Sequence, residues 1–101
     1  MTEEPFDAFA NSERLLAEAQ QDITKARPAA IEALRALLLE WGLTPRGDTV
    51  VELLEQAAET DDSLLEFRPE ATVLDRFAET PDSAERAKIF VDAARARLAN
   101  I

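Results

Sequence analysis

Apolar residues recur every three or four positions along most of the chain, and this spacing restricts the protein to helices. This spacing is clearest between Pro28 and Gly42, where the apolar residues are Ile31, Leu34, Leu37, Leu38 and Trp41. A helix of about 3.6 residues per turn places such residues on one face, whereas a half-buried strand requires strict alternation. Most of these apolar residues are Ala and Leu, which favour the helical conformation. We therefore predict an all-α protein, folded as a compact bundle of four to five helices.

The length of 101 residues suits one domain, and we predict that residues 1–101 form a single acidic helical domain. The chain contains no cysteine, so no disulfide bond holds it together. No apolar run approaches the roughly 18 residues of a membrane span, and the N-terminus is acidic where a secretory signal is basic. We expect a cytoplasmic protein that does not enter a membrane.

The path from the first helix to the second depends on Pro28. The first helix starts either at Pro5 or after a cap at residues 11–12, and both starts stay open. Proline breaks or kinks a helix, yet residues 24–27 contain no Gly, Asn or Asp that would make a turn. The apolar faces before and after Pro28 also agree within about 40°. We therefore favour one long helix kinked at Pro28 over a helical hairpin.

The segment after Gly42 is predicted to connect the second helix with the third. Gly42 occupies the position of a left-handed C-terminal cap, and residues 44–47 have the pattern of a type I turn. Thr49 and Glu52 match a capping box, which starts the third helix. The Arg-Gly-Asp tripeptide in this segment is therefore interpreted as part of a connector rather than as an integrin ligand.

Caps and prolines predict the remaining helices. A second capping box at residues 63–66 starts a helical turn that Pro69 soon ends, because the residue before a proline disfavours helix. Residues 70–79 form a fourth segment, which is expected to bury Val73, Leu74 and Phe77. The fifth helix begins with a cap and a proline at residues 80–81 and runs to about residue 99.

The chemistry of common active sites is missing from this chain. It contains no histidine and no cysteine, which excludes catalytic triads and the usual zinc sites. Its two glycines do not form a phosphate-binding loop. Asp61, Asp62 and Glu66 lack the alternating ligands and central glycine of a calcium loop. We expect no enzymatic activity, no cofactor and no bound metal.

The negative charge is concentrated in the middle of the chain. Residues 48–85 hold 12 acidic and 2 basic residues, a difference equal to the net charge of −10 of the whole protein. Like charges three or four positions apart destabilise a helix by about 0.2–0.5 kcal/mol per pair, so this spacing suggests a use in binding. The candidate binding residues are Glu52, Glu55, Glu59, Asp61 and Asp62. The alternative, that this charge only keeps the protein in solution, stays open.

Four apolar residues form a second candidate surface. Leu39 and Ile89 lie opposite the apolar faces of their helices, and Phe6 and Phe9 lie near the N-terminus. Burial in the core and exposure at an interface both remain open for them. If they are exposed, they would let copies of the protein associate.

Two functions follow from these surfaces. We predict a small non-enzymatic helical module whose acidic surface engages a basic patch on a partner protein, as an inhibitor or regulator of a nucleic-acid-binding protein. The same charge disfavours direct binding to nucleic acid or to an anionic membrane. The alternative is a structural or assembly subunit, a homo-oligomer that associates through the four apolar residues.

Overall fold

The computed structural model describes residues 5–99, with side chains from residue 7 onward. Helices make up 75% of the structure, and the described part contains no strand. The elements in order are α1 (Pro5–Glu18), η1 (Ile23–Lys25), α2 (Ala26–Glu40), α3 (Val50–Ala58), η2 (Asp62–Phe67), α4 (Arg68–Arg76) and α5 (Ser83–Leu98), where η marks a 3-10 helix. The prediction of an all-α compact bundle is confirmed.

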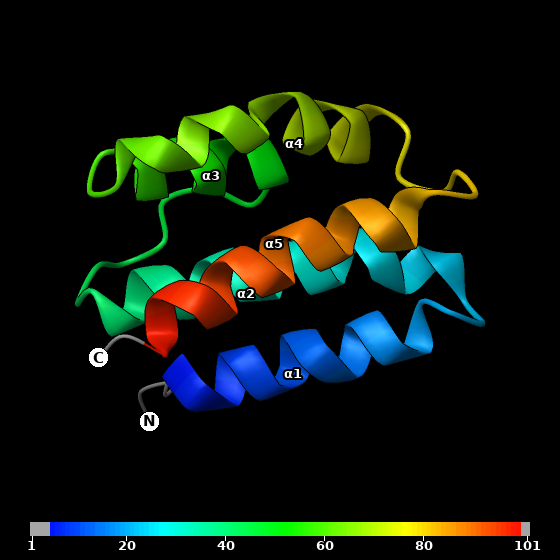
Figure 1. Ribbon diagram of the computed structural model, residues 1–101, viewed down its shortest axis with the longest axis horizontal. Coiled ribbons are helices and arrows are strands. Elements are labelled where there is room, and N and C mark those ends of the chain that lie inside the picture. The colour runs from blue at the N-terminus through cyan, green and yellow to red at the C-terminus, as the bar shows by residue number, and fades with distance from the viewer. Residues whose placement is uncertain (1–4, 100–101) are drawn as a thin grey trace.

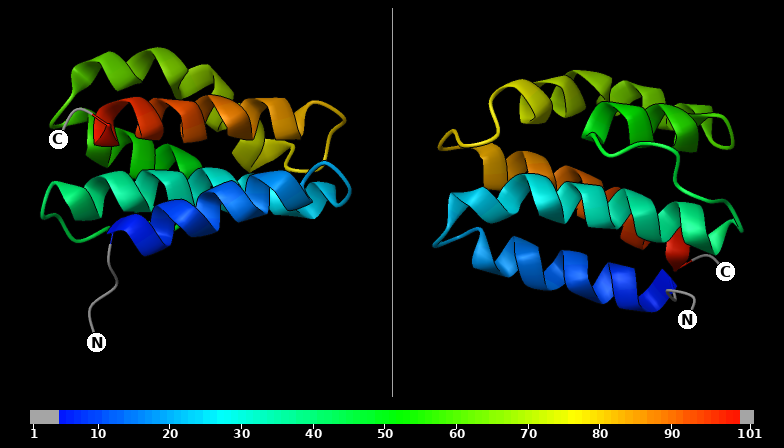
Figure 2. Two further views of the ribbon diagram at one scale, coloured as in Figure 1. Left: turned by 60° about the horizontal axis from the view of Figure 1, so that its bottom comes forward. Right: turned by 180° about the vertical axis from the view of Figure 1, so that it is seen from behind.

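The helices form two groups that pack on each other (Figure 1). α1, α2 and α5 form one group, while α3 pairs with η2 and α4 in a hairpin that packs on α2 and α5 (Figures 1 and 2). We call residues 50–76 the α3–α4 hairpin. α2 lies at the centre and contacts α1, α3 and α5, so it is apolar around most of its circumference. Its buried residues are Ala26, Ala29, Ala30, Ala33, Leu34, Ala36, Leu37 and Leu38.

The prediction of one long helix kinked at Pro28 is wrong. α1 starts at Pro5, ends at Glu18, and is followed by a reversal that brings α2 back antiparallel beside it (Figure 1). Asp22 makes this turn, because its Oδ1 accepts hydrogen bonds from the Thr24 N–H and hydroxyl at 3.2 and 2.6 Å. Pro28 falls in the first turn of α2, where a missing N–H breaks no helical hydrogen bond.

The predicted glycine cap at the end of α2 is confirmed. Gly42 has a φ of 76°, and its N–H donates to the Leu39 carbonyl at 3.0 Å. The Leu43 N–H donates to the Leu38 carbonyl at 2.9 Å. These two bonds form a Schellman motif, which satisfies carbonyl groups that the helix end would otherwise leave free.

The type I turn predicted at residues 44–47 is not formed. The connector (residues 41–49) instead runs along α3, where the buried Gln56 side chain binds it. Gln56 Nε2 donates to the Thr44 carbonyl at 2.9 Å, and Gln56 Oε1 accepts from the Arg46 N–H at 2.9 Å. A tertiary contact therefore takes the backbone groups that a local turn would have used.

The prediction of a second capping box at residues 63–66 is also wrong. Asp61 is the cap, because its Oδ1 accepts from the Ser63 N–H and hydroxyl at 3.2 and 2.6 Å. η2 then continues directly into α4, and Arg68 keeps helical angles of −59° and −40°. Pro69 does not end the helix, since it lies in the first turn of α4.

Two expectations for the last third of the chain need correction. Leu74 is buried as predicted and Val73 is half-buried, but Phe77 is 59% exposed. α4 ends at Arg76, so Phe77 lies outside the helix, and the helical spacing that predicted its burial does not apply to it. α5 begins at Ser83 and not at residues 80–81, because Thr80 and Ser83 first form a turn in which each backbone N–H bonds to the other residue.

Asp75 of α4 joins three helices. Its Oδ1 accepts from the Val50 N–H at 3.0 Å, and its Oδ2 accepts from the Val51 N–H at 2.9 Å. Both donors belong to the first turn of α3, whose N–H groups have no partner inside the helix. Arg27 of α2 also donates from Nε to Oδ1 at 2.9 Å. The Asp75 carboxylate thus caps a helix that precedes it in the chain and ties that helix to α2.

Candidate functional site

The α3–α4 hairpin carries more than half of the net negative charge of the protein. Its residues 50–76 include eight acidic and two basic side chains. Of the five predicted binding residues, Glu52, Glu55, Glu59 and Asp62 are exposed and Asp61 is half-buried. The fold therefore gathers these acids on one hairpin, but their local contacts differ.

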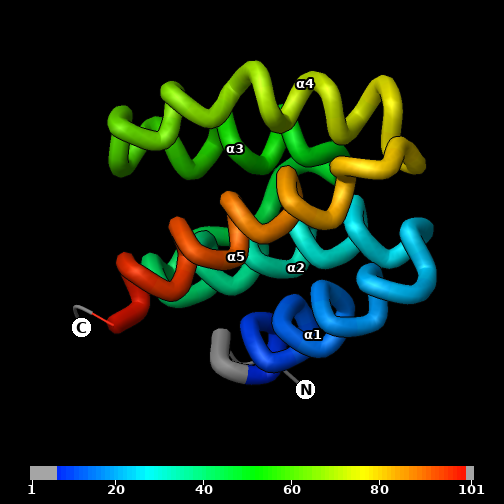
Figure 3. The backbone as a smooth tube through the Cα atoms, turned by 45° about the vertical axis from the view of Figure 1, so that its right-hand side comes forward, coloured from blue at the N-terminus to red at the C-terminus, as the bar shows by residue number. Residues whose placement is uncertain are grey.

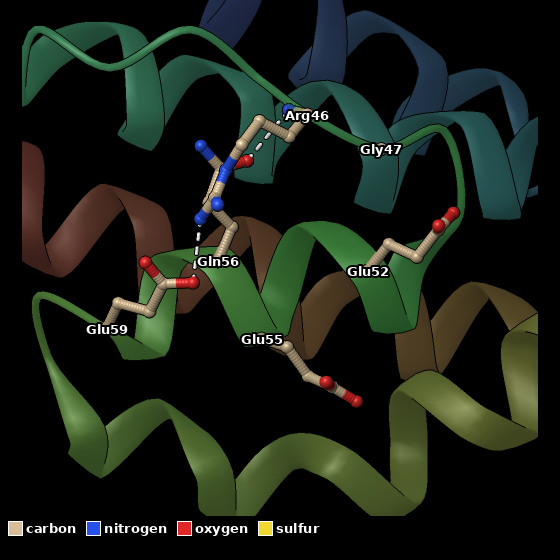
Figure 4. A pocket seen from close by; sticks show the side chains of 6 residues that line it. All are labelled: Arg46, Gly47, Glu52, Glu55, Gln56 and Glu59. Atoms are coloured by element: carbon tan, nitrogen blue, oxygen red, sulfur yellow. Dashed lines mark hydrogen bonds and ion pairs between the residues drawn. The ribbon is translucent and has the colours of Figure 1, made fainter.

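Glu55 and Glu59 lie on the exposed side of α3. With Glu52 they border a shallow hollow of about 240 Å³, and Arg46 reaches over it from the connector (Figure 4). Arg46 Nη2 lies 2.7 Å from Glu59 Oε2, and Arg68 Nη2 lies 3.3 Å from Glu55 Oε1. All four side chains are about half or more exposed, and such pairs contribute about 0–1 kcal/mol. Both carboxylates therefore remain accessible to a stronger basic partner.

Glu52 has a structural role at the start of α3. The Glu52 N–H donates to Thr49 Oγ1 at 3.1 Å, and the Thr49 hydroxyl donates to Glu52 Oε1 at 3.0 Å, which confirms the predicted capping box. The Asp48 N–H donates to the same carboxylate at 3.4 Å. These hydrogen bonds, with Thr49 first, lower the pKa of Glu52. A Cβ on Gly47 would lie 2.5 Å from Glu52 Cβ, so this close approach requires glycine.

Asp61 is likewise held by the fold. Its Oδ1 caps η2, and its Oδ2 lies 2.7 Å from Arg97 Nε of α5. Arg97 also donates to the Ser63 hydroxyl and to the Ala93 carbonyl, both at 3.0 Å. The Ser63 hydroxyl and then Arg97 lower the pKa of Asp61. Asp61 therefore fastens α5 to the α3–α4 hairpin, while its neighbour Asp62 is exposed.

Asp61 should make the stability of the protein depend on pH. A carboxylate with a lowered pKa stabilises the folded state above its ordinary pKa of 3.8, and this contribution disappears as the pH falls through the folded value. We expect Asp61→Asn to be less stable than the wild type at neutral pH, with a difference that shrinks as the pH falls below about 4. Urea unfolding between neutral pH and about pH 2 measures this difference.

The matched control for this experiment is Asp62→Asn, at the adjacent exposed carboxylate. It removes the same charge but leaves the Ser63 and Arg97 contacts of Asp61 intact. Its stability should stay within about 0.5 kcal/mol of the wild type throughout. An Asp61→Asn deficit of the same size at both ends of the pH range would contradict a stabilising role for the Asp61 charge.

The apolar candidates are not gathered into one exposed surface. Leu39, Ile89 and Phe9 are half-buried, and the Arg95 guanidinium lies 5.7 Å from the centre of the Phe9 ring. The side chain of Phe6 lies outside the described residues. Among the described side chains, the large apolar ones that are exposed are instead Leu65 at 46% and Phe77 at 59%. Sequence spacing missed both, because it assigned Phe77 to the core and no role to Leu65.

Three further findings bear on the kind of site. No helix within residues 5–99 is long and apolar enough to cross a membrane. In the same part of the chain, no group of three or more acidic residues is arranged to hold a metal ion. No protein-family model, curated protein or solved structure matches the sequence or the fold.

Proposed function

We propose that the protein is a non-enzymatic binding module whose α3–α4 hairpin engages a basic patch on a partner protein. The observation that carries this proposal is the separation of charge, with eight acids and two bases on one hairpin. A partner whose nucleic-acid site is basic fits such a surface, so inhibition or regulation of a nucleic-acid-binding protein is the role we propose.

The contacts of the acids decide which of them belong to the binding surface. Glu52 and Asp61 hold a helix start and an interhelical contact, so replacing them would disturb the fold. Glu55, Glu59 and Asp62 are exposed, and the pairs of the first two with Arg68 and Arg46 are weak. A basic patch would replace these pairs with several charge contacts at once, which raises the rate of association and the specificity.

Reversing the charge of the three exposed acids should abolish binding without unfolding the protein. The test variant carries Glu55→Lys, Glu59→Lys and Asp62→Lys. The control variant carries Asp7→Lys, Glu18→Lys and Glu40→Lys, which changes the net charge equally but lies on α1 and α2. Wild type and control should capture the same protein from a lysate of the source organism, and the test variant should not. Binding should weaken steeply as salt rises from about 50 to about 500 mM.

Three results would contradict the proposal. The first is capture of the same partner by the test variant, and the second is binding that does not respond to salt. The third is a salt-resistant oligomer, seen by light scattering, which Leu39→Asp or Ile89→Asp disrupts and the Lys changes leave intact. That third result would favour the alternative, a self-associating structural subunit.

A further inference from the structure

The α3–α4 hairpin is inserted between two helices of a group that packs without it. α1, α2 and α5, which we call the three-helix group, contact one another directly, and α2 packs more extensively on α1 and α5 than on α3. The hairpin forms a layer over α2 and α5, and α1 lies on the far side of them (Figure 3). Residues 41–49 and 77–82 connect the hairpin to the group. Movement of the hairpin would therefore break no helix of the three-helix group.

Three ion pairs of the same polarity join the hairpin to the three-helix group. The hairpin supplies the carboxylate, and α2 or α5 the arginine, in the pairs Asp61–Arg97, Glu70–Arg86 and Asp75–Arg27, with distances of 2.7, 3.4 and 2.9 Å. These side chains are 17–38% exposed, so solvent screens the pairs less than it screens fully exposed ones. The hairpin has eight acids and two bases, whereas the three helices have seven of each. An acidic element is thus docked on arginines of a neutral group.

Gly42 provides a joint between α2 and the hairpin. Gln56 of α3 binds the Thr44 carbonyl and the Arg46 N–H, so the connector from residue 44 onward is fastened to the hairpin. Gly42, at the end of α2, has a φ of 76°, and no atom lies within 4 Å of the place where a Cβ would be. Hinges are commonly a few residues at the end of an element, where the backbone angles can change. The joint therefore lies at residues 42–43.

We propose that the α3–α4 hairpin is a flap, held closed by these three ion pairs, which opens as one unit while α1, α2 and α5 stay packed. Buried leucines of the hairpin, such as Leu53 and Leu74, share one core with α2, so the closed state predominates. Openings of this kind have free energies between zero and that of global unfolding. The open state offers a basic partner the carboxylates of Asp61, Glu70 and Asp75, which the closed state pairs internally. Opening itself requires no partner.

Native-state hydrogen exchange of wild type and Val91→Ala tests whether the hairpin opens by itself. The buried cluster around Val91 is formed by residues of α1, α2 and α5, so this change weakens the three-helix group. The α2 amides should lose protection about fivefold or more. The α3 and α4 amides should keep their wild-type protection, because the change destabilises the closed and open states equally. An equal loss in α2 and in the hairpin would overturn the proposal, since the chain would then open only by global unfolding.

An arginine variant tests whether the ion pairs hold the flap closed. Arg27→Gln with Arg97→Gln removes two of the three pairs. It leaves the hydrogen bonds with which Asp75 caps α3 and Asp61 caps η2. The protection of the α3 and α4 amides at neutral pH should fall about fivefold or more, because the closed state loses contacts that the open state does not have. Circular dichroism should show the helix content of the wild type.

The matched control for the arginine variant is Arg14→Gln with Lys88→Gln. Each of these bases pairs with an acid of its own helix, so the net charge changes equally but no link to the hairpin is lost. The protection of the hairpin amides should stay within about twofold of the wild type. If the arginine variant protected these amides as well as the control does, the three ion pairs would not hold the hairpin closed, and the proposal would be overturned.

Discussion

Replacing Asp75 with alanine should lower the free energy of unfolding by about 3 kcal/mol, although only one small polar side chain is removed. The Val50 and Val51 N–H groups would lose their acceptor at the start of α3, and Arg27 would lose its carboxylate partner. Asp75 is 17% exposed, so water replaces these contacts only in part. The loss exceeds that of an ordinary helix cap because three donors in two helices lose one acceptor.

Urea unfolding of three variants tests this expectation. The midpoint should fall with little change in the denaturant dependence, since the structure of the folded state is retained. Asp75→Asn keeps one acceptor oxygen and should lose less stability than Asp75→Ala. Glu85→Gln, at an exposed carboxylate on α5, should stay within about 0.5 kcal/mol of the wild type. If Asp75→Ala matched this control, the carboxylate would not be the link between the helices.

Asp75 also shows how far local sequence patterns reach. The caps at Gly42 and Thr49 were predictable, because donor and acceptor lie within a few residues of each other in the chain. Asp75 lies 24 and 25 residues from the N–H groups it binds, and Gln56 lies 10 and 12 residues from the connector groups it binds. Contacts of this kind depend on tertiary packing, so the helices could be predicted while the links between them could not.

The error at Pro28 has a different physical origin. Along the sequence, agreement of the apolar faces before and after the proline favours one continuous helix. Two antiparallel helices in a hairpin also direct their apolar faces toward a common core, so agreement of the faces does not distinguish the two paths. The turn depends on Asp22, which lies two residues before the segment 24–27 that lacks turn-forming residues. Pro28 marks a helix start instead of a kink, and Pro69 marks a helix start instead of a helix end.

The candidate site was predictable as a set of acids but not as a working surface. Sequence spacing placed Glu52, Glu55 and Glu59 on the polar face of α3, and all three are exposed. It did not separate Glu52 and Asp61, which hold local structure, from the acids left for a partner. That separation needs the positions of Thr49, Ser63 and Arg97 around each carboxylate, which only the folded chain provides.

Replacing Phe90 with alanine should destabilise the protein by about 4 kcal/mol, the larger of the two effects. Phe90 lies on α5, is fully buried, and is the largest of the fully buried side chains of the described residues. Its ring packs edge-to-face on Phe67 of η2, with centroids 6.2 Å apart and planes at 67°. The two rings join α5 to the α3–α4 hairpin, so alanine would leave a cavity between the two groups of helices.

Phe77→Ala provides a matched control for the Phe90 substitution. The chemical change is identical, but Phe77 is 59% exposed and lies beyond the end of α4. Its removal should change the free energy of unfolding by less than about 0.5 kcal/mol. Thermal and urea unfolding of both variants measure the difference. Equal effects would mean that burial of Phe90 is not what holds α5 against the hairpin. A large loss of unfolding free energy confined to Phe90→Ala would place the main stabilising contact between the helix groups at this ring pair.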